Sequence, residues 1–207
     1  MNKSAYLIAH NLLKIQAIKF NFKEPFTWAS GWKSPVYCDN RISLSSHNIR
    51  TIIRDAYVQT IKDKFPDVEV IAGVATGAIA QGALVADNLQ LPFIYVRDKA
   101  KEHGLNKIVE GHFQPEQKIV ILEDLVSTGG SSLKVLDELR KEGANVLGMT
   151  AIFTYEFPVA EKRFEENNCK LYTLSTFSVL KNVALEEGYI TDEEANKLDE
   201  WHVNPQK

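Results

Sequence analysis

Glu123 and Asp124 are adjacent carboxylates that follow an apolar run, residues 119–122, and precede a segment of small hydroxylated residues and glycines, residues 127–131. An ionised carboxylate is a strong acceptor for neutral hydroxyl groups, whereas it repels phosphate. A glycine-rich turn at the start of a helix presents backbone N–H groups and a positive dipole end to an anion. These residues therefore favour a phosphorylated sugar as ligand, with its vicinal hydroxyls on the acids and its phosphate in the loop.

The same pattern also fits a strand, a capped turn and a helix without any ligand, as in many α/β domains. Other nucleotide-binding signatures fit the sequence less well. It contains no G-x-x-x-x-G-K-[ST] motif, and Gly73, Gly77 and Gly82 do not have the G-x-G-x-x-G spacing of a dinucleotide-binding fold.

Three segments carry a resemblance to a known family. ILEDLVSTGGSS, residues 121–132, resembles the motif with which type I phosphoribosyltransferases bind 5-phosphoribosyl 1-diphosphate (PRPP). VRDKAKEHG (96–104) resembles the catalytic loop of orotate phosphoribosyltransferases, and FTWASGWKSPVYCDNR (26–41) resembles their substrate segment. The resemblance implies transfer of the phosphoribosyl group from PRPP to orotate, which gives orotidine 5′-monophosphate and diphosphate in the synthesis of UMP.

The resemblance also implies roles for individual residues. It gives Arg97, Lys101 and His103 catalytic roles at the diphosphate, and it makes Ser127 a contact to orotate. The PRPP-binding residues that it implies are Arg97, Lys101, His103, Glu123, Asp124, Leu125, Val126, Ser127, Thr128, Gly129, Gly130 and Ser131. Weaker candidates for substrate contacts are Lys33, Tyr37, Arg41, Thr76, Gly77 and Lys99.

The sequence departs from the family pattern at several positions. Asp98 stands where many members have a lysine, and Lys99 follows one residue later. Ala29 and Tyr155 stand where some members have a lysine and an arginine that face orotate. The partner of the orotate carboxylate, and the ability of Lys99 to replace the missing lysine, are therefore open.

The resemblance further implies Mg²⁺ as cofactor, held mainly by PRPP and water rather than by protein side chains. It implies a homodimer whose active site is shared between the subunits. Two alternatives remain at this point: a salvage phosphoribosyltransferase that acts on another base, and a PRPP-sensing regulator without catalysis.

The elements that must position these residues alternate between strand and helix. Strands are predicted at 68–74, 93–97, 118–124, 146–155 and 171–177, with helices at 5–19, 78–89 and 159–167 among those between and before them. We expect a doubly wound, mostly parallel α/β sheet flanked by helices, in which the loops after Val74, Arg97 and Asp124 share one rim. Residues 1–207 are expected to form one domain: an N-terminal helix and substrate flap (1–44), an α/β core (45–180) and C-terminal helices (181–207).

Composition limits the class of protein. The 207 residues are 44% hydrophobic and 25% charged, and the net charge is −3, which argues against a nucleic-acid partner. No apolar run approaches the ~20 residues of a membrane span, and the N-terminus lacks a signal-peptide pattern. Cys38 and Cys169 are isolated and read as reduced thiols, so a cytoplasmic location is expected.

Overall fold

A six-stranded sheet, ordered β10-β9-β8-β5-β6-β7, lies at the centre of the computed structural model, which describes residues 3–28, 31–97 and 108–205. All its neighbouring pairs are parallel except β6 and β7. The strands are β5 (Val70–Val74), β6 (Phe93–Val96), β7 (Val109–Glu110), β8 (Lys118–Val126), β9 (Asn145–Thr154) and β10 (Leu171–Thr176). The predicted doubly wound, mostly parallel sheet is confirmed.

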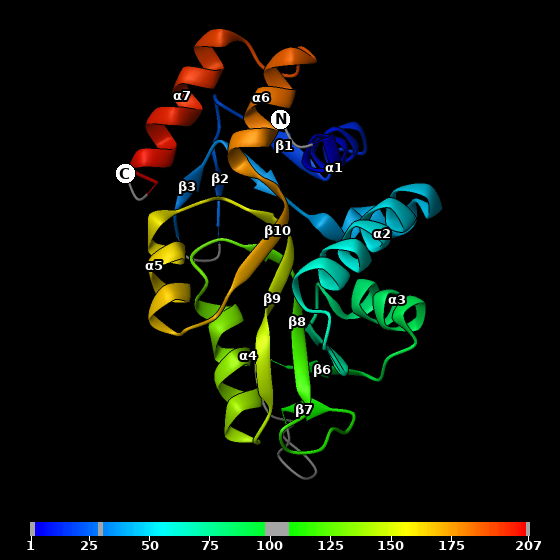
Figure 1. The fold of residues 1–207 in the computed structure, drawn as a ribbon. Coiled ribbons are helices and arrows are strands. Elements are labelled where there is room, and N and C mark those ends of the chain that lie inside the picture. The colour runs from blue at the N-terminus through cyan, green and yellow to red at the C-terminus, as the bar shows by residue number, and fades with distance from the viewer. Residues whose placement is uncertain (1–2, 29–30, 98–107, 206–207) are drawn as a thin grey trace.

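Helices cover both faces of the sheet (Figure 1), with α4 and α5 on one side and α2 and α3 on the other. The helices are α1 (Lys3–Lys14), η1 (Asn40–Ser45, a 3₁₀ helix), α2 (His47–Lys64), α3 (Ile79–Leu89), α4 (Gly130–Lys141), α5 (Pro158–Glu166), α6 (Phe177–Glu186) and α7 (Asp192–Val203). Because both faces are covered, β5 is buried along its whole length and β8 is buried from Ile119 to Glu123.

Two short antiparallel pairs form the flap above this sheet: β1 (Ile18–Phe20) with β4 (Val36–Cys38), and β2 (Phe26–Thr27) with β3 (Lys33–Ser34). The prediction of a helix to residue 19 is wrong at its end. Gln16 has a φ of 58°, so the chain leaves the helix there and Ile18 pairs with Cys38. The helix α2 begins after Ser46, whose side chain accepts from the Ile49 N–H, as is usual for a serine at a helix start.

The C-terminal helix α7 holds the flap from the side (Figure 1). Trp201 Nε1 donates to the carbonyl oxygen of Lys33 at 2.9 Å, and its ring meets that of Trp28 edge-on with centroids 5.9 Å apart. His202 stacks on Phe177, the first residue of α6, with ring centroids 4.6 Å apart. The flap is thus tied to the end of the chain by aromatic packing and by a hydrogen bond to its backbone.

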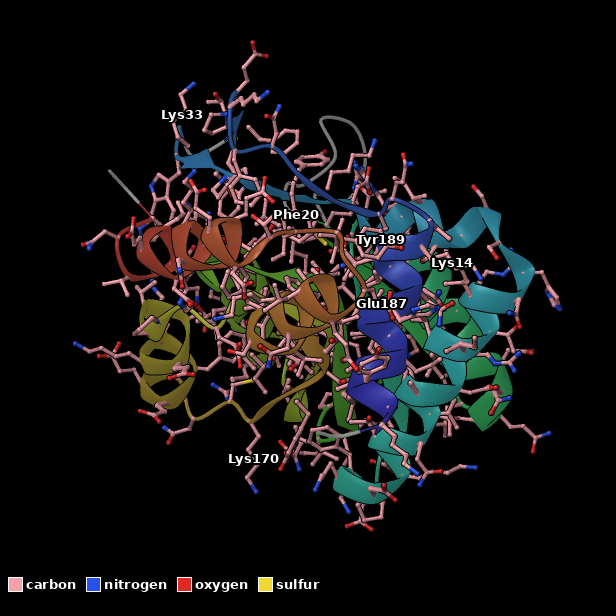
Figure 2. The ribbon with its side chains drawn as sticks, turned by 90° about the horizontal axis from the view of Figure 1, so that it is seen from above. Lys14, Phe20, Lys33, Lys170, Glu187 and Tyr189 are labelled. Atoms are coloured by element: carbon pink, nitrogen blue, oxygen red, sulfur yellow. The ribbon has the colours of Figure 1, made fainter. Side chains whose placement is uncertain are left out.

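At the other side of α6, Glu187 lies against α1 (Figure 2), where its Oε1 is 2.7 Å from His10 Nδ1. The first helix of the chain therefore packs against α6 and β10, where the Ser175 hydroxyl in β10 also donates to the carbonyl oxygen of Ala5. Across the described ranges, none of the helices combines the length and hydropathy that crossing a lipid bilayer requires.

Replacement of Trp201 by alanine should weaken the fold by removing a half-buried ring and the donor to Lys33. We expect a loss of about 2 to 3 kcal/mol in the free energy of unfolding, below the ~3–5 kcal/mol of a fully buried aromatic residue. Urea titration would measure it. Val203→Ala, on the same helix at a side chain that is 75% exposed, is the control; equal stability losses in the two variants would contradict this account.

Candidate active site

A cavity of about 340 Å³ lies at the carboxyl ends of β5 and β8. Its walls come from segments that are distant in the sequence: the end of β4 and start of η1, the loop after β5, and the end of β8 with the start of α4. The lining residues are Cys38, Asp39, Arg41, Val74, Ala75, Thr76, Gly77, Glu123, Asp124, Leu125 and Ser131. The expected convergence of the loops after Val74 and Asp124 is therefore confirmed.

The acid pair forms the floor of this cavity. Glu123 is 4% exposed, and its carboxylate accepts hydrogen bonds from the Ser132 hydroxyl at 2.7 Å and the Asp124 N–H at 3.0 Å. Burial, followed by the negative charge of Asp124, raises the pKa of Glu123 from 4.5 to about 8. Burial also raises the pKa of Asp124, which is less deeply buried than Glu123. The pair therefore holds a proton more tightly than two separate acids would.

Side chains from outside the strand hold the backbone of the acid pair. The Tyr57 hydroxyl in α2 donates to the carbonyl oxygen of Glu123 at 2.5 Å, and Asn40 Nδ2 donates to that of Asp124 at 2.7 Å. The register between β5 and β8 ends with Gly73 opposite Leu122, one residue before the acids. Buried carbonyl groups need partners, so Tyr57 and Asn40 fix the backbone where strand pairing with β5 stops.

The loop after β5 approaches Asp124 so closely that a side chain at residue 77 would displace the Asp124 carboxylate. A Cβ atom at Gly77 would lie 2.1 Å from Asp124 Oδ2, inside any allowed contact distance. The neighbouring Ala75–Thr76 peptide bond is cis. Thr76 and Gly77, which the sequence analysis names as weaker candidates for substrate contacts, both line the cavity.

The loop after β8 turns into α4 at Gly129, which has a φ of 77° and no side-chain cap for the helix. A Cβ atom added at Gly129 would lie 2.9 Å from the Phe164 ring in α5, and Arg163 Nη1 donates to the Thr128 carbonyl oxygen at 2.9 Å. The loop therefore packs against α5. The first N–H groups of α4 have no side-chain acceptor, which is the arrangement that suits an anion.

Asp39 and Arg41 form the wall that faces the flap. Arg41 donates from Nε to Asp39 Oδ1 at 2.7 Å and from Nη2 to Oδ2 at 2.9 Å. Asp39 Oδ1 also accepts from the Arg41 N–H at the start of η1. These hydrogen bonds lower the pKa of Asp39, chiefly through the Arg41 side chain. The guanidinium is therefore held in one orientation at the rim of the cavity.

Several predicted site residues lie elsewhere. Lys33 is at the outer edge of the flap (Figure 2), where its Nζ donates to Thr27 Oγ1 at 2.6 Å, and Tyr37 packs on Phe26 with centroids 5.4 Å apart. Arg97 Nη1 is 3.5 Å from Glu110 Oε1 in β7. None of these three side chains lines the cavity among the residues that the structure covers.

Other predictions concern residues that the structure does not describe. These are Ala29, Asp98, Lys99, Lys101 and His103, which lie outside the described ranges. Leu125, near the end of β8, and Ser131, at the start of α4, line the cavity directly. The residues between them are Val126, Ser127, Thr128, Gly129 and Gly130, which complete β8, form the loop and begin α4.

Sequence reasoning missed some residues of the site. Cys38 and Asp39 lie in the segment 26–41 that resembles the family's substrate segment, but they were not predicted to be site residues. A polar residue directly after a short strand, as Asp39 is after β4, is a usable signal. Asn40 and Tyr57 gave no such signal, because Tyr57 sits on the apolar face of a helix and Asn40 reads as a turn residue. Their roles appear only from the hydrogen bonds that they make.

Comparisons with known proteins agree with this geometry. Residues 43–180 match the family model described as phosphoribosyl transferase domain. The chain is 52% identical over 200 residues to an orotate phosphoribosyltransferase of Porphyromonas gingivalis, covering 97% of this chain and 95% of that protein. It is 52% identical over 186 residues to an orotate phosphoribosyltransferase of Streptococcus pneumoniae, covering 90% and 89%.

Solved structures of similar fold include an orotate phosphoribosyltransferase from Aeropyrum pernix, with a TM-score of 0.76 and 26% identity, covering 89% of this chain and 99% of that one. The UMP synthase of Leishmania donovani has a TM-score of 0.83 at 20% identity, and the match covers 97% of this chain but 42% of that one. At that identity the second likeness concerns the fold alone.

The pKa of Glu123 predicts how the stability of the ligand-free protein depends on pH. The folded state keeps a proton up to about pH 8, whereas the unfolded chain loses it near 4.5. Stability should therefore be highest below pH 4.5 for this group and fall as pH rises toward 8, by at most about 1.4 kcal/mol per pH unit.

Urea unfolding at a series of pH values would test this in the wild type and in Glu123→Gln, which should remove most of the slope. Glu166→Gln, on the exposed side of α5, is the control and should keep the wild-type slope. Identical slopes in the wild type and the Glu123 variant would contradict the assignment.

Proposed function

The chain belongs to the orotate phosphoribosyltransferase family, and from this premise we infer that it transfers the phosphoribosyl group of PRPP to orotate. The products are orotidine 5′-monophosphate and diphosphate, in the route to UMP. The observation that carries this function is the acid pair at the floor of a cavity between the loops after β5 and β8, in a chain half identical to orotate phosphoribosyltransferases over nearly its whole length.

The acid pair is proposed to hold the ribose of PRPP. The carboxyl oxygens of the pair accept hydrogen bonds from the vicinal hydroxyls, and the negative charge that the pair keeps beside the Glu123 proton lies near the sugar carbon that becomes positive as the diphosphate leaves. The loop 127–131 takes the 5′-phosphate on backbone N–H groups at the start of α4. Tyr57 and Asn40 support the pair by fixing its backbone, so the reacting carbon is held in one place.

The diphosphate is proposed to lie over the loop after β5, where Thr76 and Gly77 offer backbone groups. Arg97, Lys101 and His103 supply positive charge and hydrogen bonds to it, and Lys99 remains a weaker candidate for the same task. Negative charge develops on the leaving oxygens, so cations and donors around them lower the barrier. His103 can also protonate the leaving group.

Ser127 is proposed to contact orotate from the loop after β8, and the flap closes over the base. Lys33 and Tyr37 are weaker candidates for contacts to the base. Their exposed positions on the flap are compatible with this role only at the mouth of the site. The reaction needs no covalent intermediate with the protein, since positioning and electrostatics suffice.

Magnesium is proposed as the cofactor, entering with PRPP and held mainly by substrate oxygens and water. The cavity fits an ion held in this way, because Asp124 offers carboxylate oxygens to which water bound to Mg²⁺ can donate, while Asp39 is already paired with Arg41. When bound, it neutralises charge on the diphosphate.

We also propose a homodimer in which each active site takes loop residues from the partner subunit, and a cytoplasmic location. Arg97 lies by Glu110 rather than in the cavity of its own chain, which a shared site would account for. Cys38 and Cys169 are both free, which suits a reducing compartment.

The function is tested by supplying PRPP and Mg²⁺ with orotate, uracil, adenine or hypoxanthine and following loss of each base. Orotate should be consumed fastest, with orotidine 5′-monophosphate as product. Faster use of another base would show a salvage enzyme instead. PRPP binding without consumption of any base would favour the regulatory alternative.

Asp124→Asn should impair the use of PRPP without unfolding the protein. The substitution keeps the shape but removes the charge that accepts the ribose hydroxyl, so kcat/KM for PRPP should fall about ten- to hundred-fold, as for one hydrogen bond to a charged group. Steady-state kinetics would measure it, with the exposed Asp137→Asn on α4 as control. Unchanged kinetics for PRPP would refute the ribose assignment.

The shared site is tested by mixing Lys101→Ala with Asp124→Asn after dissociating both dimers. Each variant alone should be nearly inactive. A mixed dimer has one site with both native residues if the loop acts across the interface, so random mixing should restore about a quarter of the wild-type activity. No recovery, with mixed dimers verified by mass spectrometry, would show that each subunit has a self-contained site.

A further inference from the structure

The cavity is lined by more acidic than basic side chains, although the acceptor base of the proposed reaction is an anion. Asp39, Glu123 and Asp124 all line it. Of the described residues in the lining, Arg41 alone carries a full positive charge. Orotate bears a carboxylate on its ring, and an anion that enters an acidic cavity needs a cation to offset the repulsion.

Arg41 is held so that part of its guanidinium stays available. Its Nε and Nη2 each give one N–H to Asp39, at 2.7 and 2.9 Å. A guanidinium has five N–H donors, so three remain, on Nη1 and on the far side of Nη2. One N–H of Nη1 and the remaining N–H of Nη2 point in the same direction, at the end of the guanidinium. Together they can donate to both oxygens of a second carboxylate.

Asp39 also restricts the side-chain conformation of Arg41. The Asp39 carboxylate binds the Arg41 side chain and the Arg41 N–H together, at the start of η1. The next residue, Asn40, is buried and bonded to the carbonyl of Asp124. The guanidinium is thus oriented before substrate arrives, and its position is set relative to the acid pair that holds the ribose.

The other cationic or polar candidates are less suited to the carboxylate. Lys33 is engaged by Thr27 at the outer edge of the flap (Figure 2) and does not line the cavity. Tyr155 is 1% exposed, and its ring stacks on Phe157 with an interplanar angle of 8°. A side chain so enclosed does not meet a substrate without repacking the cluster around it.

We propose that Arg41 binds the carboxylate of orotate end-on, and thereby selects orotate over bases that lack this group. The inference rests on the proposed function and deepens it by naming a residue that determines the choice of base. Arg41 then bridges two carboxylates, with Asp39 on one edge of the guanidinium and the substrate on the other.

The test compares Arg41→Gln and Arg41→Lys with the wild type, using two pairs of ligands. Orotate and uracil differ by the ring carboxylate, and so do orotidine 5′-monophosphate and UMP. In Arg41→Gln, the KM for orotate and the Kd for orotidine 5′-monophosphate should both rise about ten- to hundred-fold, as for the loss of a charge-assisted contact. The KM for PRPP and the Kd for UMP should change less than about threefold.

Arg41→Lys should lie between the wild type and Arg41→Gln, because it keeps the charge and loses the fork. The matched control is Arg54→Gln on α2. Arg54 also donates from Nε and Nη2 to a neighbouring carboxylate, Asp55, at 2.9 and 2.7 Å, but it does not line the cavity. This control should leave all four constants unchanged. Circular dichroism would verify that each variant is folded.

The outcomes separate this inference from the proposed function. A wild type that consumes orotate while Arg41→Gln keeps its affinity for orotate and orotidine 5′-monophosphate would overturn the inference alone. So would a rise confined to PRPP, which would move Arg41 to the diphosphate, or an equal rise for UMP, which would show a structural role. A wild type that does not consume orotate would overturn the proposed function itself.

Discussion

The fold has to keep two neighbouring carboxyl groups at the end of its central strand without leaving their charge or their backbone unpartnered. Burial of an acid disfavours its ionised form, and a second acid beside it adds to the effect. The protein offsets part of this cost with the Ser132 hydroxyl on Glu123. It supports the two carbonyl groups with Tyr57 and Asn40, which come from α2 and η1. The active site therefore depends on elements that precede the whole sheet in the sequence.

The sheet topology explains why segments so far apart in the chain form one site. β5 and β8 are parallel neighbours, so the loops that follow them leave the same edge. The first loop approaches Asp124 without displacing its carboxylate because residue 77 has no side chain. The third wall, at Asp39 and Arg41, directly follows the flap strand β4, and the aromatic packing of Trp201 ties the flap to the C-terminal helix. The packing of α7 near the C-terminus therefore supports the flap, and through the flap the position of the wall at Asp39 and Arg41.

Local sequence signals located most of this framework. The apolar runs before the acids and before the loop at Gly77 predicted the strands β8 and β5 correctly. The end of the first helix was not predicted, because Gln16 adopts a positive φ with no glycine to signal it. The supports of the acid pair were also missed. Tyr57 and Asn40 meet their partners 66 and 84 residues further along the chain, and side-chain periodicity carries no information about such contacts.

Arg41 places a positive charge in this cavity while the pKa values of Glu123 and Asp124 stay raised. Its charge lowers the pKa of Asp124, but burial acts more strongly in the opposite direction. The Arg41 side chain is 57% exposed, and Asp39 already takes two of its donors, so solvent and the ion pair both screen its effect on the acids. An arginine deep in the cavity would instead pair with Asp124 and occupy the carboxylate that we propose for the ribose. Placement at the rim, anchored by Asp39, leaves Asp124 free of this pairing and leaves the outer edge of the guanidinium open for the proposed contact to the base.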